Sequence, residues 1–273
     1  MSAGPIRLGM RERPGDESKR MGVSATLLIT ALLMLAIRGA FAADLTREDV
    51  QAALAAAPPE RGASFAGRSL AGLDLHELDF SRADLSGADL SDADLRGAKL
   101  VAAKLVGARL PRARLNLAWI MGADFSHAEL SDAVLETLIV SAGLETQPEE
   151  AASFVGANLS GAKVTARFSL DDMRDADLSH LRASADMRNQ SMGLIRADFS
   201  RAKLAGANFA GAALAHVNFE FAKLQRASFS GADLMAADFA GADLTDADFT
   251  GANIAGADFN SAITTGASGL PTR

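Results

Sequence analysis

Residues 80–100 read FSRADLSGADLSDADLRGAKL, in which one five-residue pattern occurs four times in succession. An apolar side chain occupies every fifth position, and an alanine precedes it by two residues. A period of five fits neither the 3.6-residue period of an α-helix nor the strict alternation of a long β-strand. The pattern therefore predicts a short extended segment followed by a bend, repeated along the chain.

The same pattern runs from Phe65 to Val140 and returns from Phe199 to Thr264. In the first block, fourteen of the sixteen fifth positions are Leu or Phe, and twelve of the sixteen have Ala two residues earlier. In the second block, thirteen of the fourteen earlier positions are Ala. We expect both positions to point inward, because a narrow interior would be overpacked by anything larger than Ala beside each Leu or Phe.

In the second block, Phe alternates with Leu or Ile, so that Phe recurs every ten residues from Phe199 to Phe259. Phe can stack on Phe only if one full coil is a multiple of ten residues long. Four sides of five residues meet this condition, whereas three sides would stack Phe on Leu. The alternation therefore favours a four-sided β-helix of about nine coils, spaced ~4.8 Å apart.

The recurring words SGADL, AGANF and TDADF resemble those of the pentapeptide-repeat family, whose units read A-(D/N)-L-x-x. The resemblance covers most of the chain after residue 62. It implies an all-β solenoid, namely a right-handed, four-sided β-helix of pentapeptide repeats. It implies no single function, because one fold can carry unrelated activities.

Residues 1–42 are predicted to be a signal peptide. Basic side chains precede an apolar run at 25–37, and Ala40-Phe41-Ala42 follows as a small-x-small cleavage pattern. Cleavage after Ala42 would export the protein, to the periplasm, with no membrane attachment afterwards. The alternative is an uncleaved N-terminal segment that anchors the protein in the membrane. Cleavage removes six cations and three anions and changes the formal charge from −7 to −10.

Residues 46–57 are predicted to form a helix, with Thr46 as its N-cap and Pro58-Pro59 as its stop. We expect this helix to cover the open first coil, as terminal caps do in solenoids. At the other end, the Gly- and Thr-rich tail is a weak cap. The last coil is therefore predicted to be a homodimer surface, unless the tail folds over it.

The repeat divides the rest of the chain into segments. A capping helix and linker occupy 43–62, repeat coils occupy 63–140, 154–179 and 197–264, and a tail occupies 265–273. A polar loop at 141–153 and an off-frame insertion at 180–196 interrupt the coils, and the frame slips by one residue between Val164 and Phe168. Long insertions in compact folds are often functional.

The insertion and its neighbourhood are the predicted binding site for a protein partner, because flexible Met and Arg side chains suit protein contacts. The residues concerned are Arg174, Arg182, Asp186, Met187, Arg188 and Met192. The alternative is that these methionines plug an irregular gap between two stacks of coils. Trp119, on an outward position, could also anchor a partner.

The outward charges are predicted to form bands. Lys99, Lys104, Arg109 and Arg114 would occupy four successive sides as a basic girdle, whereas residues 227–272 contain no Lys or Arg. This acidic end suggests a DNA mimic, since some pentapeptide-repeat proteins act on gyrase in this way. Its residues are Asp233, Asp238, Asp243, Asp248 and Asp258. Against this stand the predicted export and the absence of a C-terminal dimerisation helix; alternatively, these Asp residues only suit the bends.

Catalytic patterns are absent from the sequence. The chain has no Cys, its four His residues are scattered, and it has no phosphate-binding glycine motif. We therefore expect no enzyme, no cofactor and no metal, and the acidic charge makes nucleic acid an unexpected partner. The predicted function is a non-catalytic exported scaffold or protein-interaction module. The alternatives are the DNA mimic and a purely structural envelope component.

Overall fold

The structure, a computed structural model, describes residue 1 and residues 44–58, 60–143, 146–184 and 196–271. The chain divides into two units, residues 1–42 and 43–273, and the second unit contains the repeat. The predicted signal peptide, apart from residue 1, lies outside the described residues. Among the residues described, no helix is both long and apolar enough to span a bilayer.

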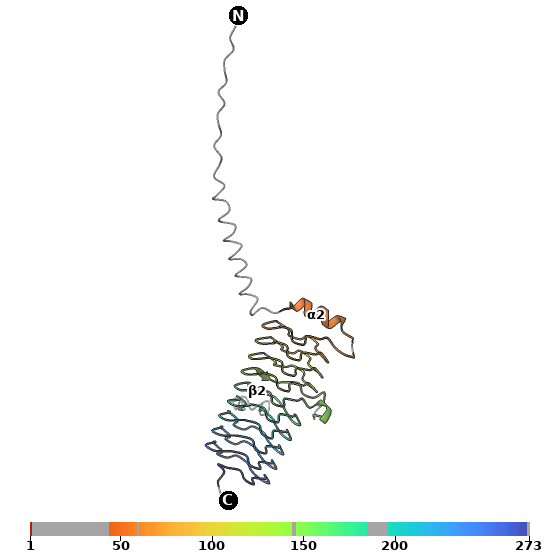
Figure 1. The fold of residues 1–273 in the computed structure, drawn as a ribbon. Coiled ribbons are helices and arrows are strands. Elements are labelled where there is room, and N and C mark those ends of the chain that lie inside the picture. The colour runs from red at the N-terminus through yellow and green to blue at the C-terminus, as the bar shows by residue number, and fades with distance from the viewer. Residues whose placement is uncertain (2–43, 59, 144–145, 185–195, 272–273) are drawn as a thin grey trace, which may run out of the picture. The chain divides into compact units, whose positions relative to one another are not determined.

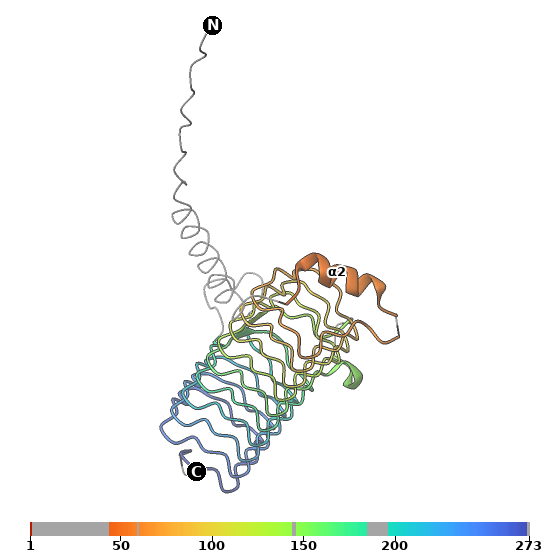
Figure 2. The same ribbon diagram turned by 45° about the horizontal axis from the view of Figure 1, so that its top comes forward.

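The repeat forms a stack of parallel coils (Figures 1 and 2). In the regular coils, the outward residue before an inward Leu or Phe forms a parallel bridge with the residue twenty positions later, for example Asp84 with Lys104. Twenty residues are four units of five, so the coil has the four sides that the Phe alternation predicts. The ladders that begin at Ser64, Ser69, Asp74 and Asp79 define the first, second, third and fourth sides.

Regular secondary structure is short within the described residues. Helix α2 spans Arg47–Ala56, strand β1 spans Val134–Glu136, the 3-10 turn η2 spans Pro148–Glu150, and strand β2 spans Lys163–Thr165. β1 and β2 pair in parallel on the third side, with Leu135 opposite Val164. Elsewhere in the stack, adjacent coils meet through single-residue bridges.

The two inward positions are buried, as predicted. Leu90 and Ala88, for instance, are both completely buried. In the second block, Phe199 stacks on Phe219 with 5.3 Å between ring centroids, and Phe209 meets Phe219 edge-on at 5.6 Å. The interior is therefore a continuous column in which each Phe contacts rings in its own coil and in the next.

Many corners of the coils combine a left-handed residue with a side-chain hydrogen bond. Gly87, with φ of +63°, occupies one such corner. The outward Asp or Asn accepts a hydrogen bond from the backbone N–H two residues later, as Asp84 does from Ser86 at 3.1 Å. This is an Asx-turn. The Asp of each A-D-L word is therefore a turn-forming residue as well as a surface charge.

Two insertions and one deletion interrupt the regular spacing between bridge partners. The loop after Val140 lengthens the spacing, so that Asp124 bridges Ser153. The slip before Phe168 makes the spacing one residue shorter than a regular coil, as between Ser153 and Asp172. The second insertion lengthens the spacing again, so that Asp172 bridges Lys203. The buried Phe168 confirms the predicted frame slip.

The predicted start of the second insertion at residue 180 is wrong. Arg182 bridges Lys163 on one side and Ala213 on the other, and Leu181 and Ala183 are both completely buried. The word Leu181-Arg182-Ala183 therefore continues the repeat, with the large and small inward residues exchanged. The pair keeps its total volume, and such exchanges are tolerated in cores. The ladder also continues past the predicted end at residue 264, because Ser268 bridges Asp248.

Helix α2 lies against the N-terminal end of the stack (Figure 2). Thr46 and Asp49 form a reciprocal capping box, and Val50 is completely buried. Arg47 donates a hydrogen bond from Nη2 to the carbonyl of His76, at 3.2 Å. Leu73 and Leu78, which occupy positions that are Ala in later coils, are half-buried and pack with the core.

Candidate functional site

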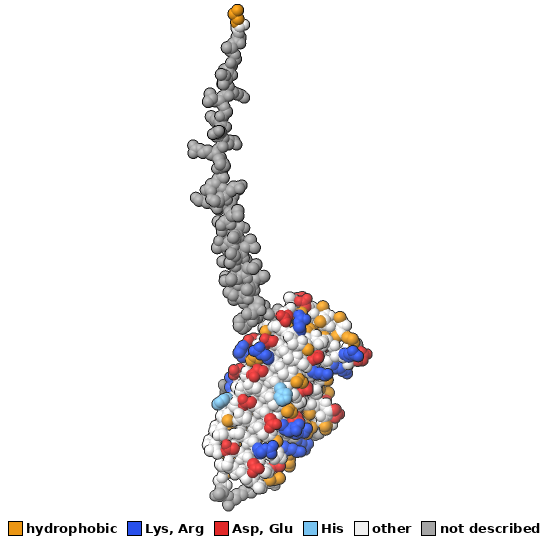
Figure 3. All heavy atoms as spheres, in the orientation of Figure 1, with side chains coloured by type: hydrophobic (Ala, Val, Ile, Leu, Met, Phe, Trp, Pro, Cys, Tyr) orange, Lys and Arg blue, Asp and Glu red, His pale blue; other side chains and the backbone are white. Residues whose placement is uncertain are grey.

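The basic girdle is paired with carboxylates of the preceding coil. Lys99, Lys104, Arg109 and Arg114 occupy the four sides of one coil, and their bridge partners are Asp79, Asp84, Asp89 and Asp94. Arg109 Nη1 lies 3.7 Å from Asp89 Oδ2. A hydrogen bond from Ser86 lowers the pKa of Asp84, and the charge of Lys104 lowers it further. Figure 3 shows acidic and basic side chains interspersed on one face.

The five Asp residues of the acidic end lie on all four sides. Asp243 belongs to the first side, Asp248 to the second, Asp233 to the third, and Asp238 and Asp258 to the fourth. Each accepts a hydrogen bond from the N–H two residues later, from 2.8 Å at Asp258 to 3.3 Å at Asp233. The structure therefore arranges them as a ring of turn-forming residues.

The predicted partner-binding residues fall into two groups. Arg174 pairs with Asp172 through two hydrogen bonds of 2.8 Å, beside the first side. Arg182 lies on the third side and donates a hydrogen bond to the Gly161 carbonyl at 3.1 Å. The two arginines therefore lie on different sides. The other predicted residues lie outside the described residues: Asp186, Met187, Arg188 and Met192.

An apolar face interrupts the polar surface on the fourth side. Leu117 and Met121 lie in the turns before and after Trp119, which stands between Lys99 and Ile139 in the ladder. Leu117 is 54% exposed, and Trp119, Met121 and Ile139 are half-buried. The sequence identified Trp119 as outward, but Leu117 and Met121 were missed. The sequence feature that could have revealed them is LNLAWIM at 115–121, where apolar residues occupy outward positions.

The fourth-side ladder is broken directly after this apolar face. Bridges join Trp119 to Ile139 and Arg167 to Asp198, but none is recorded between Ile139 and Arg167. The break leaves a cleft of about 450 Å³. Its lining is Thr137, Leu138, Ile139, Val140, Ser141, Gly143, Thr165, Ala166, Arg167, Arg196 and Asp198.

A smaller hollow of about 240 Å³ adjoins the cleft and shares Arg167 and Asp198 with it. Glu150 holds the loop that leads to both, because its carboxylate accepts hydrogen bonds from Ser141 Oγ at 2.8 Å and Ala142 N at 3.0 Å. A hydrogen bond from the Gln147 N–H lowers the pKa of Glu150. The loop at 141–150 is therefore anchored where it borders the cleft.

Asp171 is a buried carboxyl at an inward position that is Ala in most repeats. Its Oδ1 accepts a hydrogen bond from Ala152 N at 2.8 Å, and its Oδ2 has no partner among the described residues. In a regular repeat this N–H donates to the carbonyl three residues earlier, as Ala123 does to Ile120. After the loop, Ala152 N makes no such bond to the Glu149 carbonyl, and the Asp171 carboxyl group accepts from it instead. Burial raises the pKa of Asp171 to about 8.

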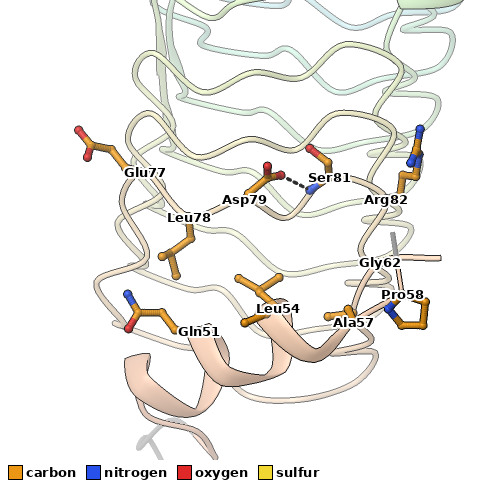
Figure 4. Close-up of a pocket in the computed structure, with 12 residues that line it drawn as sticks. Gln51, Leu54, Ala57, Pro58, Gly62, Glu77, Leu78, Asp79, Ser81 and Arg82 are labelled. Atoms are coloured by element: carbon orange, nitrogen blue, oxygen red, sulfur yellow. Dashed lines mark hydrogen bonds between the residues drawn. The ribbon is translucent and has the colours of Figure 1, made fainter. Parts of the chain in front are cut away.

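A third hollow, of about 440 Å³, lies between α2 and the first coils. Figure 4 shows Leu54 of α2 and Leu78 of the coil directed into it, with Glu77, Asp79 and Arg82 at its edge. No group of three His, Cys, Asp or Glu side chains able to hold a metal exists among the described residues.

Comparison with known proteins agrees with this architecture. A family model described as pentapeptide repeats matches residues 61–97, 98–136, 194–231 and 227–266, in eight copies, which together exceed half of the chain. The chain belongs to the pentapeptide repeat family. The fold of this family is a right-handed β-helix, which is therefore the fold of the chain.

Solved structures of similar proteins are also pentapeptide repeat proteins. HetL, from the cyanobacterium Nostoc and involved in regulating heterocyst differentiation, is 24% identical, with a TM-score of 0.52. The match covers 82% of this chain and 97% of HetL. QnrB1, a plasmid-mediated fluoroquinolone resistance protein, is 18% identical over 73% of this chain and 83% of its own, with a TM-score of 0.37. No curated protein matches the chain. At these identities, the likeness to HetL supports the fold alone.

Proposed function

We propose that this pentapeptide repeat protein is a non-catalytic scaffold that binds a protein partner through its fourth side. The observation that carries the proposal is the apolar face of Leu117, Trp119 and Met121 beside the cleft. Members of the family are generally not enzymes. Aromatic and Met side chains are enriched at protein interfaces, whereas Asp and Lys are depleted there.

Leu117 occupies a corner of the coil where glycine is favoured. Its φ is +62°, a left-handed conformation that Gly adopts at many equivalent corners. For a non-glycine residue this conformation costs about 1–2 kcal/mol. Other non-glycine residues, such as Leu170 and Phe221, adopt the same conformation at their own corners, so it is the exposed apolar side chain of Leu117, rather than its strain, that suggests a contact.

The predicted insertion is close to the proposed interface in the chain. Arg196, which follows residues 185–195 directly, lines the cleft. The proposal therefore includes Asp186, Met187, Arg188 and Met192 as partner contacts. Arg174 and Arg182 are weaker members, because each is hydrogen-bonded within the stack and neither lines the cleft.

The Leu117→Gly variant tests the proposed interface without harming the fold. Gly relieves the left-handed strain, so thermal stability should stay unchanged or rise by about 1 kcal/mol. Capture of the protein's partner from its native cells should fall at least tenfold. Ala236→Gly is the matched control, because Ala236 has a φ of +53° at the same kind of corner in a distant coil. Equal capture by both variants would exclude this face as the interface.

The proposal also includes export. Cleavage after Ala42 should yield a periplasmic protein whose first residue is Ala43, which N-terminal sequencing after cell fractionation measures. Recovery of an intact protein from the cytoplasm would contradict export. In that case, a gyrase supercoiling assay would test the acidic ring as a DNA mimic. An intact protein in the membrane fraction would instead support the uncleaved anchor.

The proposal also includes the roles of the two ends of the stack. We expect α2 to act as the cap of a rod of about nine coils, since buried Val50 and the enlarged Leu73 and Leu78 suit that role. At the other end, Ile254 and Phe259 are half-buried rather than buried. That surface is consistent with a homodimer.

A further inference from the structure

Beside the cleft on the fourth side, two main-chain groups lack, among the described residues, the partners that they have in every regular coil. In the coil before the girdle, Leu78 O accepts a hydrogen bond from Lys99 N at 2.9 Å, and Phe80 N donates to Lys99 O at 2.7 Å. Leu138 and Val140 are the equivalents of Leu78 and Phe80. The Leu138 carbonyl and the Val140 N–H have no hydrogen bond to any residue that the structure describes.

The cause of the unpaired groups lies in the next coil. Arg167 on the fourth side follows Lys163 on the third by four positions instead of the regular five, because of the frame slip. The two coils still pair at Thr137 and Thr165, with 3.1 Å between Thr137 N and Thr165 O, and the ladder ends there. Leu138 and Val140 are buried residues, only 8% and 7% exposed. Buried main-chain groups without partners are rare and costly, so these two favour an added partner.

One residue of an extended peptide would satisfy both groups. Its N–H would donate to Leu138 O and its carbonyl would accept from Val140 N, as Lys99 does with Leu78 and Phe80. Addition of a strand to an exposed sheet edge is a common mode of peptide recognition. The neighbouring Ile139 and Ala166 side chains offer apolar contacts within the cleft.

The charges of the cleft differ from those of the chain as a whole. Two arginines, Arg167 and Arg196, line it together with one carboxylate, Asp198. Arg167 Nε lies 3.8 Å from Asp198 Oδ2, and Arg196 Nη1 makes a long contact of 3.5 Å with the His216 carbonyl. The cleft therefore carries net positive charge on a protein whose formal charge is −7. Arginine is the side chain best suited to bind a carboxylate in two-point geometry.

We propose that the cleft binds an extended segment of a partner protein that carries an acidic side chain, with Leu138 and Val140 pairing its backbone and Arg196 its carboxylate. This inference rests on the proposed function and names the chemistry of the partner. The apolar face around Trp119 would then contact the rest of that partner.

The test uses the full chain and an array of acetylated hexapeptides with randomised flanks around a fixed central Glu, Gln or Lys. Fluorescence anisotropy then gives the affinity of the best Glu peptide. We expect the matched Lys peptide to bind at least tenfold more weakly. Methylation of the backbone nitrogen at the central residue should cause a similar loss. Equal binding of the Glu and Lys peptides, or no binding of any peptide at millimolar concentration, would overturn the proposal.

Variants of the chain separate this inference from the proposed function. Arg196→Glu should weaken the Glu peptide at least tenfold, whereas Arg226→Glu, on an exposed corner away from the cleft, should not. If Arg196→Glu retains capture of the native partner while Leu117→Gly loses it, the interface stands and the acidic-peptide site is wrong. If both variants retain capture, both proposals are wrong.

Discussion

Replacement of Phe229 by Asp should abolish cooperative folding of the repeat. Phe229 is completely buried, and its ring stacks between Phe209 at 5.0 Å and Phe249 at 4.9 Å. Loss of a buried Phe side chain costs about 3–5 kcal/mol, and a buried carboxylate without a partner adds a desolvation cost of several kcal/mol more. The sum approaches or exceeds the whole stability of an ordinary domain, about 5–15 kcal/mol.

Urea unfolding followed by circular dichroism measures this effect. Two controls bracket the result. Phe229→Leu should remain folded, because Leu occupies the alternate inward positions such as Leu224 and Leu234. Met235→Asp should change stability by less than about 0.5 kcal/mol, because Met235 is an outward residue that is 43% exposed. Melting of Phe229→Asp like the unmodified protein would refute the inward assignment.

Asp171→Asn should stabilise the protein in a pH-dependent manner. The folded-state pKa of Asp171 is raised from 3.8 to about 8, so between these values the folded state binds more protons than the unfolded state. Stability from this group is therefore full below pH 4 and falls as the pH rises towards 8. The total loss is on the order of 5 kcal/mol, from the difference between the two pKa values. Asn keeps an acceptor for Ala152 N–H and does not ionise.

The comparison requires urea unfolding of both proteins at pH 4 and pH 9. The two should be about equally stable at pH 4, and the Asn variant should be more stable by several kcal/mol at pH 9. Asp171→Ala should gain less than Asn, because it leaves the Ala152 N–H without its partner. A difference between Asp and Asn that is the same at both pH values would contradict the buried, neutral carboxyl.

The sequence determined the coils because each unit repeats the same local conditions. Each five-residue unit contains an inward Leu or Phe, a small Ala and, in many units, a turn-forming Asp. Because these residues shape the backbone locally, the structure of one unit predicts that of the next. The Phe alternation then predicted the number of sides. Phe can stack on Phe in the next coil only if the coil length is a multiple of ten residues, and four sides of five residues meet that condition. The ring stacks from Phe199 to Phe259 confirm that step.

The features around the candidate site could not be predicted because they depend on contacts between coils. Leu181-Arg182-Ala183 keeps its place through the bridges of Arg182 to two neighbouring coils. Asp171 matters only because the loop deprives Ala152 of its turn partner. The cleft arises where a loop in one coil meets a shortened side in the next. The sequence contains each change, but only the stacking brings them together on the fourth side.

In-cell photo-crosslinking tests the central claim, a protein-binding fourth side, most directly. A photoreactive amino acid would replace Leu117 in one strain and Met235 in a second, both of which have exposed side chains. The account predicts a discrete crosslinked partner from position 117 that is absent from position 235. Crosslinks of equal pattern and yield from both positions, or none from position 117, would contradict it.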